Sequence, residues 1–373
     1  MKNGQYIPIF EPHLKFNEKK YLLNCLKTNW ISSQGIYIKK FENKIAKLHK
    51  AKYCVATSSC TTALHIALVS LDIGKGDEVI CPALSFISPA NMIALTGAKL
   101  VLVDVESENL NINTELIEKK INKKTKAILF VNQFGNQANI DSLIKISKKY
   151  NLKLIEDNAE SFMGEYNNKK LGTFSDIGVF SFFANKIITT GEGGALITNN
   201  KKIYNKLIIL RDHGMSKKKK YFHTCLGFNY RMTNMQAAIG CSQLENIDKI
   251  LRKRRKIFNY YYVNLIEFKE IQILTNKMIT NKKNANWLFT IVFKTKQIRN
   301  RVLKYLKLKN IEARPMIRPI NEALHFKNQF KIDQFPIAKS FSDKSLHLPS
   351  STGLSTTQQK RIISNLRDYF NSN

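Results

Sequence analysis

Short apolar runs alternate with amphipathic stretches along the first half of the chain. Residues 15–50 place apolar side chains at helical spacing, interrupted by the turn-like segment NWISSQG (29–35). Further helical patterns lie at 62–71, 114–121 and 140–150. The β-branched or apolar runs between them predict strands at 53–57, 78–83, 99–105, 126–134, 153–159, 176–186 and 193–200. This alternation predicts an α/β fold with a mixed, mostly parallel sheet flanked by helices.

The pattern changes in the last third of the chain. A long helical region at 235–265 is followed by a strand near 287–294 and by helices near 297–308 and 356–370. A chain of 373 residues is long enough for one large domain and one smaller domain. We therefore expect a large domain over residues 12–248 and a small α+β domain over residues 249–373, to which residues 1–11 are joined.

The composition is ordinary for a globular protein, with 43% hydrophobic and 24% charged residues. No apolar run approaches the roughly 20 residues that a membrane helix needs. The N-terminal sequence MKNGQYIPIF lacks the features of a signal peptide, so we expect a cytoplasmic protein with no membrane partner. The six cysteines show no CxxC pair and no metal-ligand spacing, so we expect neither a disulfide framework nor a metal site.

A net charge of +32 is compatible with binding to a nucleic acid, an anionic surface or a phosphorylated substrate. Lys, Asn and Ile are abundant from end to end, however, and the densest basic clusters resemble a loop (217–220) and a solvated helix face (252–256). No nucleic-acid-binding motif accompanies them. We therefore attribute the charge to overall composition and expect no nucleic-acid partner, while a diphosphate substrate remains compatible with it.

Three candidate functional features each follow a predicted strand: an acid, a lysine and a helix start rich in hydroxyl side chains. Asp157 ends the strand of KLIEDNAES, at the sheet edge where α/β proteins bind ligands. Lys186 follows the strand of FSFFANK and precedes the glycine-rich TTGEGG (189–194). Hydroxyl residues gather where the helix after the predicted strand at 53–57 begins: Ser58, Ser59, Thr61 and Thr62. The free N–H groups at the start of a helix attract phosphate.

These residues match the needs of an enzyme that uses pyridoxal phosphate (PLP): a Schiff-base lysine, a carboxylate for the pyridinium nitrogen, a phosphate cradle and a wall against the ring. Asp157 would keep the pyridine nitrogen protonated. A partly desolvated Lys186 beside a cationic cofactor would lose proton affinity and serve as nucleophile and proton shuttle. Ser181 would add a phosphate donor and Phe86 a wall. Taken singly, each residue also fits a simpler role in helix capping, at the surface or in the core.

Longer motifs resemble those of a known family. They include TNWISSQGIYIKKFENK (28–44), TSSCTTALHIAL (57–68), LIEDNAES (154–161), NKIITTGEGG (185–194) and GFNYRMTN (227–234). Over almost its whole length the chain resembles the PLP-dependent nucleotide-sugar aminotransferases of fold type I, the aspartate aminotransferase superfamily, and among them most closely the GDP-perosamine synthases. The resemblance implies PLP as cofactor, glutamate as amino donor and a nucleotide-linked 4-keto-6-deoxy sugar as acceptor at C4, with GDP-4-keto-6-deoxymannose as the first candidate.

The resemblance also implies roles for individual residues. Lys186 would carry PLP, Asp157 would pair with its pyridinium nitrogen, and Glu160 would lie near its phenolic oxygen. Phe86 and Ala159 would sandwich the ring. The phosphate would be held by Ser59, Cys60, Thr61 and Ser181, joined by Asn229 of the partner subunit, which implies a homodimer with shared active sites. The segments that face the nucleotide-sugar would contribute Trp30, Ser33, Arg231 and Arg314.

Three positions depart from the family pattern. Cys60 replaces a glycine where backbone meets phosphate, and its side chain would be costly if the site needs a positive φ. Asn132 and Asn321 replace frequent histidines in segments where recognition is expected. These departures leave open a UDP- or dTDP-linked 4-keto-6-deoxy hexose as the acceptor, or a PLP-binding regulator without catalysis. A related sugar 3-dehydratase would carry His in place of Lys186.

Overall fold

A seven-stranded sheet organises most of the chain in the computed structural model, which describes residues 4–274 and 282–372. Its order is β1-β9-β8-β5-β4-β2-β3, in which the strands from β8 to β3 run parallel and β9 runs antiparallel to both neighbours. The mixed, mostly parallel sheet predicted from the sequence is confirmed. The strand bounds are β1 Tyr53–Thr57, β2 Glu78–Pro82, β3 Lys99–Val103, β4 Thr125–Val131, β5 Lys153–Asp157, β8 Ile177–Ser181 and β9 Gly194–Thr198.

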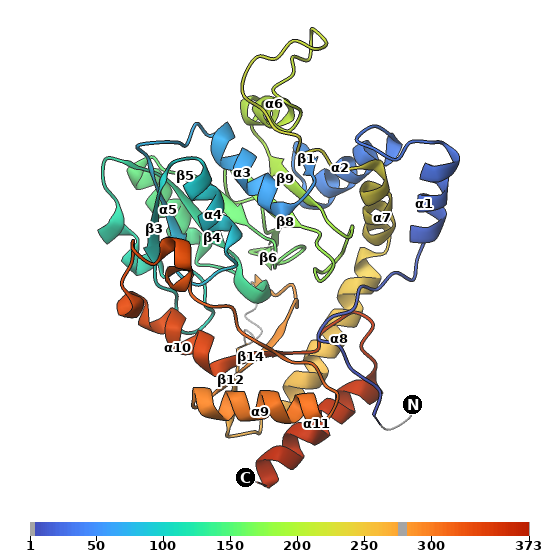
Figure 1. The fold of residues 1–373 in the computed structure, drawn as a ribbon, viewed down its shortest axis with the longest axis vertical. Coiled ribbons are helices and arrows are strands. Elements are labelled where there is room, and N and C mark those ends of the chain that lie inside the picture. The colour runs from blue at the N-terminus through green and yellow to red at the C-terminus, as the bar shows by residue number, and fades with distance from the viewer. Residues whose placement is uncertain (1–3, 275–281, 373) are drawn as a thin grey trace.

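Helices surround this sheet (Figure 1). Helix α3 is buried on nearly all sides, which explains why its sequence is mostly apolar, whereas α5 buries one face that includes Leu143 and Ile146. No helix in residues 4–274 or 282–372 combines the length and apolarity that crossing a bilayer requires. The helix bounds are α1 Glu18–Lys27, α2 Ile36–His49, α3 Cys60–Ser70, α4 Ser88–Leu95, α5 Ile140–Tyr150, α6 Lys201–Leu210 and α7 Asn234–Glu245.

A second sheet of four antiparallel strands, in the order β10-β12-β14-β13, lies below the first in Figure 1. It shares a separate apolar core with helices α8, α9 and α11. A third small sheet has the order β11-β6-β7, so β6 pairs with both β11 and β7. The bounds are β6 Glu165–Tyr166, β7 Lys169–Lys170, α8 Ile247–Leu265, β10 Ile271–Ile273, β11 Lys282–Lys283, β12 Phe289–Phe293, α9 Lys296–Leu308, β13 Arg314–Pro315, α10 Pro336–Lys344, β14 Ser345–Leu348 and α11 Thr356–Asn371.

The N-terminal segment contacts this second core. Ile7 forms a parallel β-bridge with Ile311 and is buried in the same apolar cluster. The predicted boundary after residue 248 falls near the start of α8, whose Ile250 packs on the large core while Ile257 packs on the small one. That boundary stays a prediction, and residues 1–3 and 373 of the predicted domains lie outside the described residues.

Two sequence-based helix predictions need correction. Residues 114–121 form two short 3₁₀ turns, Thr114–Leu116 and Glu118–Lys120, because the segment lacks the length and the continuous apolar face of an α-helix. The helical region at 235–265 is divided at Asn246 into α7 and α8. Helices α6 and α10 are present although the sequence pattern did not reveal them.

The basic cluster at 252–256 is not wholly a solvated helix face. Arg254 on α8 is fully buried, and its guanidinium donates hydrogen bonds to the carbonyl oxygens of Asn286 (3.0 Å) and Trp287 (2.7 Å) and to the hydroxyl of Thr352 (3.2 Å). Burial lowers the pKa of this guanidinium to about 9. A buried cation without a carboxylate partner is costly, so these hydrogen bonds are what keep it in place.

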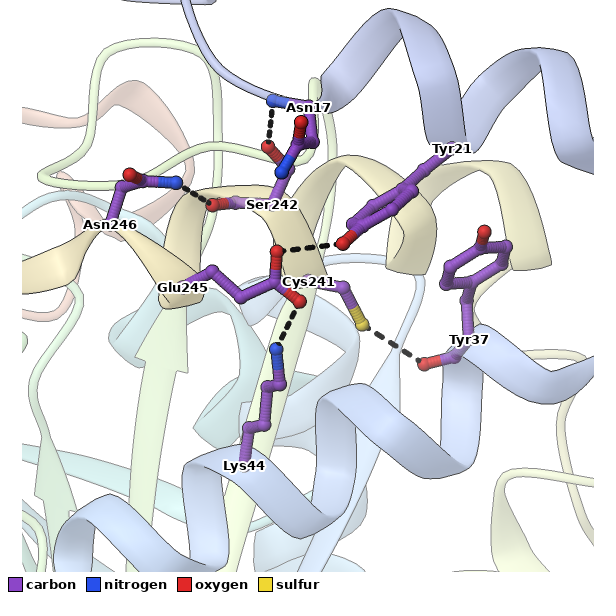
Figure 2. A network of polar contacts seen from close by, with 8 residues as sticks. All are labelled: Asn17, Tyr21, Tyr37, Lys44, Cys241, Ser242, Glu245 and Asn246. Atoms are coloured by element: carbon purple, nitrogen blue, oxygen red, sulfur yellow. Dashed lines mark hydrogen bonds and ion pairs between the residues drawn. The ribbon is translucent and has the colours of Figure 1, made fainter.

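Helices α1 and α2 are held to α7 by polar contacts, shown in Figure 2. The carboxylate of Glu245 accepts a hydrogen bond from Tyr21 of α1 (2.8 Å) and pairs with Lys44 of α2. The hydroxyl of Ser242 accepts a hydrogen bond from the backbone N–H of Asn17 (2.9 Å). These contacts fix the N-terminal helices on either side of the predicted substrate segment at 29–35.

Candidate active site

A cavity of about 430 Å³ lies at the carboxyl edge of the parallel strands and is closed by the second sheet. Asp157 ends β5, Ser181 ends β8, and Val131 ends β4, so adjacent strands deliver their last residues to the same space. The second sheet contributes Arg314 and His347. Ten of the residues predicted from the sequence line this cavity: Ser59, Cys60, Thr61, Phe86, Asp157, Ala159, Glu160, Ser181, Lys186 and Arg314.

Asp157 is buried at the floor of the cavity. One carboxylate oxygen accepts a hydrogen bond from the backbone N–H of Ala159 (2.8 Å), which fixes the side chain at the strand end. Burial raises the pKa of Asp157 to about 6, and that N–H and the nearby Lys186 oppose the shift. A carboxylate placed here can stay ionised when a cationic group lies against it.

Lys186 occupies a turn between β8 and β9. The backbone N–H of Lys186 donates to the carbonyl of Phe183 (3.0 Å), and the hydroxyl of Thr189 accepts from the N–H of Gly191 (2.8 Å), so the turn is internally hydrogen-bonded. Burial lowers the pKa of the Lys186 amine, while Glu160, Cys60 and Asp157 act in the opposite direction. A larger fraction of neutral amine is therefore present than for a surface lysine, as a nucleophile requires.

The start of α3 forms a concave backbone surface. Ser59 caps the helix through a reciprocal capping box with Thr62, so the simple capping role of this serine is real. Gly194 of β9 lies directly against it: a Cβ there would come within 2.5 Å of the carbonyl group of Ser59 and 2.7 Å of the N of Cys60. Ser59, Cys60 and Thr61 of this helix start line the cavity, and the free N–H groups of the first turn of a helix suit a phosphate.

Cys60 does not strain this turn. It is the first residue of α3 and is not among the residues with positive φ, so a side chain is compatible with its backbone. Burial, reinforced by Asp157, raises the pKa of its thiol well above the usual value, so the sulfur is neutral. The strain that we expected from a cysteine in place of glycine is therefore not present in the backbone at Cys60.

Glu160 is held by a strained neighbour. One of its carboxylate oxygens accepts a hydrogen bond from the backbone N–H of Phe134 (2.8 Å). Phe134 has a φ of 51°, a left-handed conformation that is uncommon for a bulky residue and typical of functional sites. Burial raises the pKa of Glu160 to about 7. Glu160 can therefore gain or lose a proton near neutral pH.

Four predicted residues do not line the cavity of a single chain: Trp30, Ser33, Asn229 and Arg231. Asn234 at the start of α7 organises their surroundings, since its amide accepts from the N–H of Tyr37 (3.0 Å) and donates to the carbonyl of Trp30 (2.7 Å). Arg231 pairs with Asp212 (2.9 Å) and contacts the exposed amide of Asn229. One chain alone therefore does not bring these residues to Lys186.

The two asparagines that replace family histidines are also outside the cavity lining. Asn132 is fully buried beneath it, where its amide donates to the side chains of Glu156 (3.1 Å) and Asn158 (2.8 Å). Asn321 is buried and donates to the carbonyl of Lys331 (3.1 Å). The expectation that both asparagines lie where substrate is recognised is therefore not supported for a single chain, because their amides are used in internal packing.

Sequence reasoning missed four aromatic residues of the cavity: Phe134, Phe183, Trp287 and His347. Trp287 lies on Lys186, with its ring centroid 3.7 Å from the lysine Nζ. The His347 ring lies 5.0 Å from that of Phe134, and burial, together with Arg314, lowers the pKa of His347 to about 3, so it is neutral. Trp287 is one of only two tryptophans and begins the strand predicted near 287–294, which was the available signal.

A half-buried lysine, a buried carboxylate and a helix start that lines the same cavity at the edge of such a sheet define the class of PLP-dependent enzymes of fold type I. The chain belongs to the DegT/DnrJ/EryC1/StrS aminotransferase family, whose model matches residues 12–367. This membership confirms the predicted fold class, the aminotransferase activity and PLP as the cofactor.

Individual relatives are similar over nearly their full length. The chain is 37% identical to a GDP-perosamine synthase of Escherichia coli O157:H7 (98% of this chain, 99% of the relative) and 38% identical to one of Vibrio cholerae, with the same coverage. Among solved structures, it is 28% identical to PseC of Helicobacter pylori, an aminotransferase of pseudoaminic acid biosynthesis, with a TM-score of 0.93 and coverage of 99% of this chain and 100% of that chain.

The raised pKa of Glu160 predicts a pH-dependent stability effect. A carboxyl whose pKa is about 7 in the folded protein and 4.5 in the solvated, unfolded chain favours folding below pH 4.5, and this contribution is lost as the pH rises through 7. Glu160→Gln should therefore stabilise the cofactor-free protein at pH 8, by up to about 3 kcal/mol, with little difference near pH 4.5. Thermal unfolding across this range measures it, with exposed Glu267→Gln as the control. Parallel pH profiles for wild type and Glu160→Gln would contradict the burial cost.

Proposed function

We propose that this chain is a PLP-dependent aminotransferase that transfers an amino group, with glutamate as donor, to C4 of a nucleotide-linked 4-keto-6-deoxy sugar. One observation carries the proposal: Lys186, Asp157 and the start of α3 meet in a single cavity at the carboxyl edge of the sheet. The residues present fit PLP, because a half-buried lysine, a buried carboxylate and the N–H groups of a helix start match its aldehyde, its ring nitrogen and its phosphate.

The side chains would divide the work as follows. Lys186 would hold the cofactor covalently and, when released, move a proton between the two carbon atoms that flank the transferred nitrogen. Asp157 would bind the protonated ring nitrogen, since its carboxylate is fixed by Ala159 and needs a cationic partner in a buried site. Bound PLP supplies an electron sink that lets an amino group be taken from one substrate and given to another.

The remaining cavity residues would orient the cofactor. The phosphate would lie on the first turn of α3, with Ser59, Cys60, Thr61 and Ser181 around it. Phe86 and Ala159 would lie on opposite faces of the ring, and Glu160 would approach the phenolic oxygen. With a pKa of about 7, Glu160 suits a place where a proton is shared.

The alternatives are less well supported. A sugar 3-dehydratase of this type carries His in place of the cofactor lysine, and here Lys186 is in the cavity. The hypothesis of a regulator without catalysis rested on Cys60, whose backbone is unstrained.

The six cysteines, all in the described residues, are unbridged, which supports a reducing cytoplasm as the place of action.

A homodimer would complete the site. Asn229, Trp30, Ser33 and Arg231 lie outside the cavity of their own chain, so we propose that they serve the cavity of a partner subunit. Support comes from large apolar side chains that are exposed on the same segments: Trp30 at 55%, Tyr221 at 75% and Leu226 at 82%.

The acceptor we propose is GDP-4-keto-6-deoxymannose, with GDP-perosamine as the product. The support is the 37–38% identity to GDP-perosamine synthases over nearly the full length of both chains. Arg314 of the second sheet lines the cavity, paired with Glu312 (2.9 Å), and offers a cation toward an anionic substrate.

The assignment of Lys186 predicts one labelled lysine. Purified protein with PLP should show a visible absorption band, and borohydride reduction followed by peptide mapping should place the pyridoxyl group on Lys186 alone. Lys186→Ala should lose both the covalent link and turnover, because no other lysine lines the described part of the cavity. A pyridoxyl label on a different lysine would refute the assignment.

The shared site predicts complementation between two inactive proteins. Lys186→Ala mixed with an Asn229→Ala variant should regain turnover, because a mixed dimer holds one cavity with both residues intact. The measurement is activity after the two proteins are unfolded and refolded together, with each variant alone as control. A fully active monomer in sedimentation would show that no partner is needed.

The acceptor assignment predicts a preference among nucleotide sugars. At one glutamate concentration, kcat/KM should be highest for GDP-4-keto-6-deoxymannose when it is compared with UDP- and dTDP-linked 4-keto-6-deoxy hexoses. A tenfold preference corresponds to about 1.4 kcal/mol, within reach of one or two hydrogen bonds to the base. A tenfold preference for a UDP or dTDP sugar would overturn the acceptor and leave the aminotransferase intact.

A further inference from the structure

Trp287 brings an aromatic face to the reactive lysine from the opposite domain. It precedes β12 of the second sheet, is 5% exposed, and lines the cavity that contains Lys186. Its ring centroid is 3.7 Å from the lysine Nζ, well within the distance at which a cation is attracted to an indole face. The family roles implied by the sequence leave this tryptophan unassigned.

Trp287 is fixed on three sides. Its indole N–H donates to the carbonyl of Asn185 (2.8 Å), the residue directly before Lys186. Its own carbonyl accepts from the buried guanidinium of Arg254 (2.7 Å). Its ring lies parallel to that of Phe134, at an interplanar angle of 4° and a centroid distance of 6.4 Å. A side chain held by three elements keeps its orientation when the lysine moves.

We propose, building on the proposed function, that Trp287 is a positioning residue: its indole face holds the protonated amine of Lys186 in the cavity whenever that amine is not bonded to the cofactor. A complete amino transfer would release the lysine from the cofactor in its first half and bond it again in its second half, so the free amine would have to return to the same place. A free amine on a four-carbon stem has many conformations, and a fixed aromatic face selects among them.

The charged groups around Lys186 are compatible with a contact between its protonated amine and the indole. Asp157, Glu160 and Cys60 of the large domain line the same cavity, together with Glu192 from the loop after Lys186 and with Arg314 and His347 of the second sheet. Burial favours the neutral amine, whereas the nearby Glu160 favours the cation. The indole face adds to the cationic side of this balance without adding a titratable group.

The test measures the lysine itself in cofactor-free protein. Trace acetylation with acetic anhydride across a pH series, followed by mass spectrometry of the peptide that contains Lys186, gives the pH at which its amine becomes half neutral. Trp287→Leu should lower this midpoint by about one pH unit. Trp287→Phe keeps an aromatic face and loses the indole N–H, so its midpoint should fall by less.

Phe258→Leu is the matched control, since Phe258 is a buried aromatic residue of the same domain that packs on Phe289 away from the cavity. It should leave the midpoint unchanged. A wild-type or raised midpoint in Trp287→Leu, with native circular dichroism, would overturn the proposal; if that variant does not fold, an unchanged midpoint in Trp287→Phe would overturn it. Because acetylation needs no PLP, absence of a PLP band in wild type would refute the proposed function and leave this result standing.

Discussion

Desolvation of charge at the carboxyl edge of the parallel strands is the constraint on which the site depends. Burial is the largest cause that raises the pKa of Asp157 to about 6 and of Glu160 to about 7 and that lowers the pKa of Lys186. Such groups are expensive unless partners neutralise them. The charged groups lie close together because the ends of β4, β5 and β8 meet at one edge of the sheet. The second domain lines the other side of the cavity and excludes water from it.

That constraint also explains which parts of the site the sequence revealed. Asp157 and Lys186 were predictable because each ends or follows a strand within one short motif, and parallel topology brings such ends together. Phe134, Trp287 and His347 were not, because they come from a strained turn and from a second sheet whose packing on the first has no local signature. Strand β14, which carries His347, is four residues long, and its alternation of polar and apolar residues (SLHL) is too short to predict a strand.

The fold shows the same difference between features that have a local sequence signal and features that depend on tertiary packing. Strands and helices with a strong period were predicted near their observed bounds, whereas 114–121 was too short for its apolar positions to tell a 3₁₀ turn from an α-helix. Arg254 was taken for a surface residue because charge normally predicts exposure. Its burial depends on carbonyls of residues 286 and 287, which only the tertiary structure brings to α8.

The bridge between Ile7 and Ile311 has a consequence for synthesis of the chain. The small core needs Ile7 from the first residues and Leu366 from the last helix, so it cannot be completed until translation has reached the C-terminal end. The seven-stranded sheet, by contrast, has all its strands by residue 198. Domains fold as units during synthesis, so the seven-stranded sheet can form before the residues of the second sheet that line the cavity have been made.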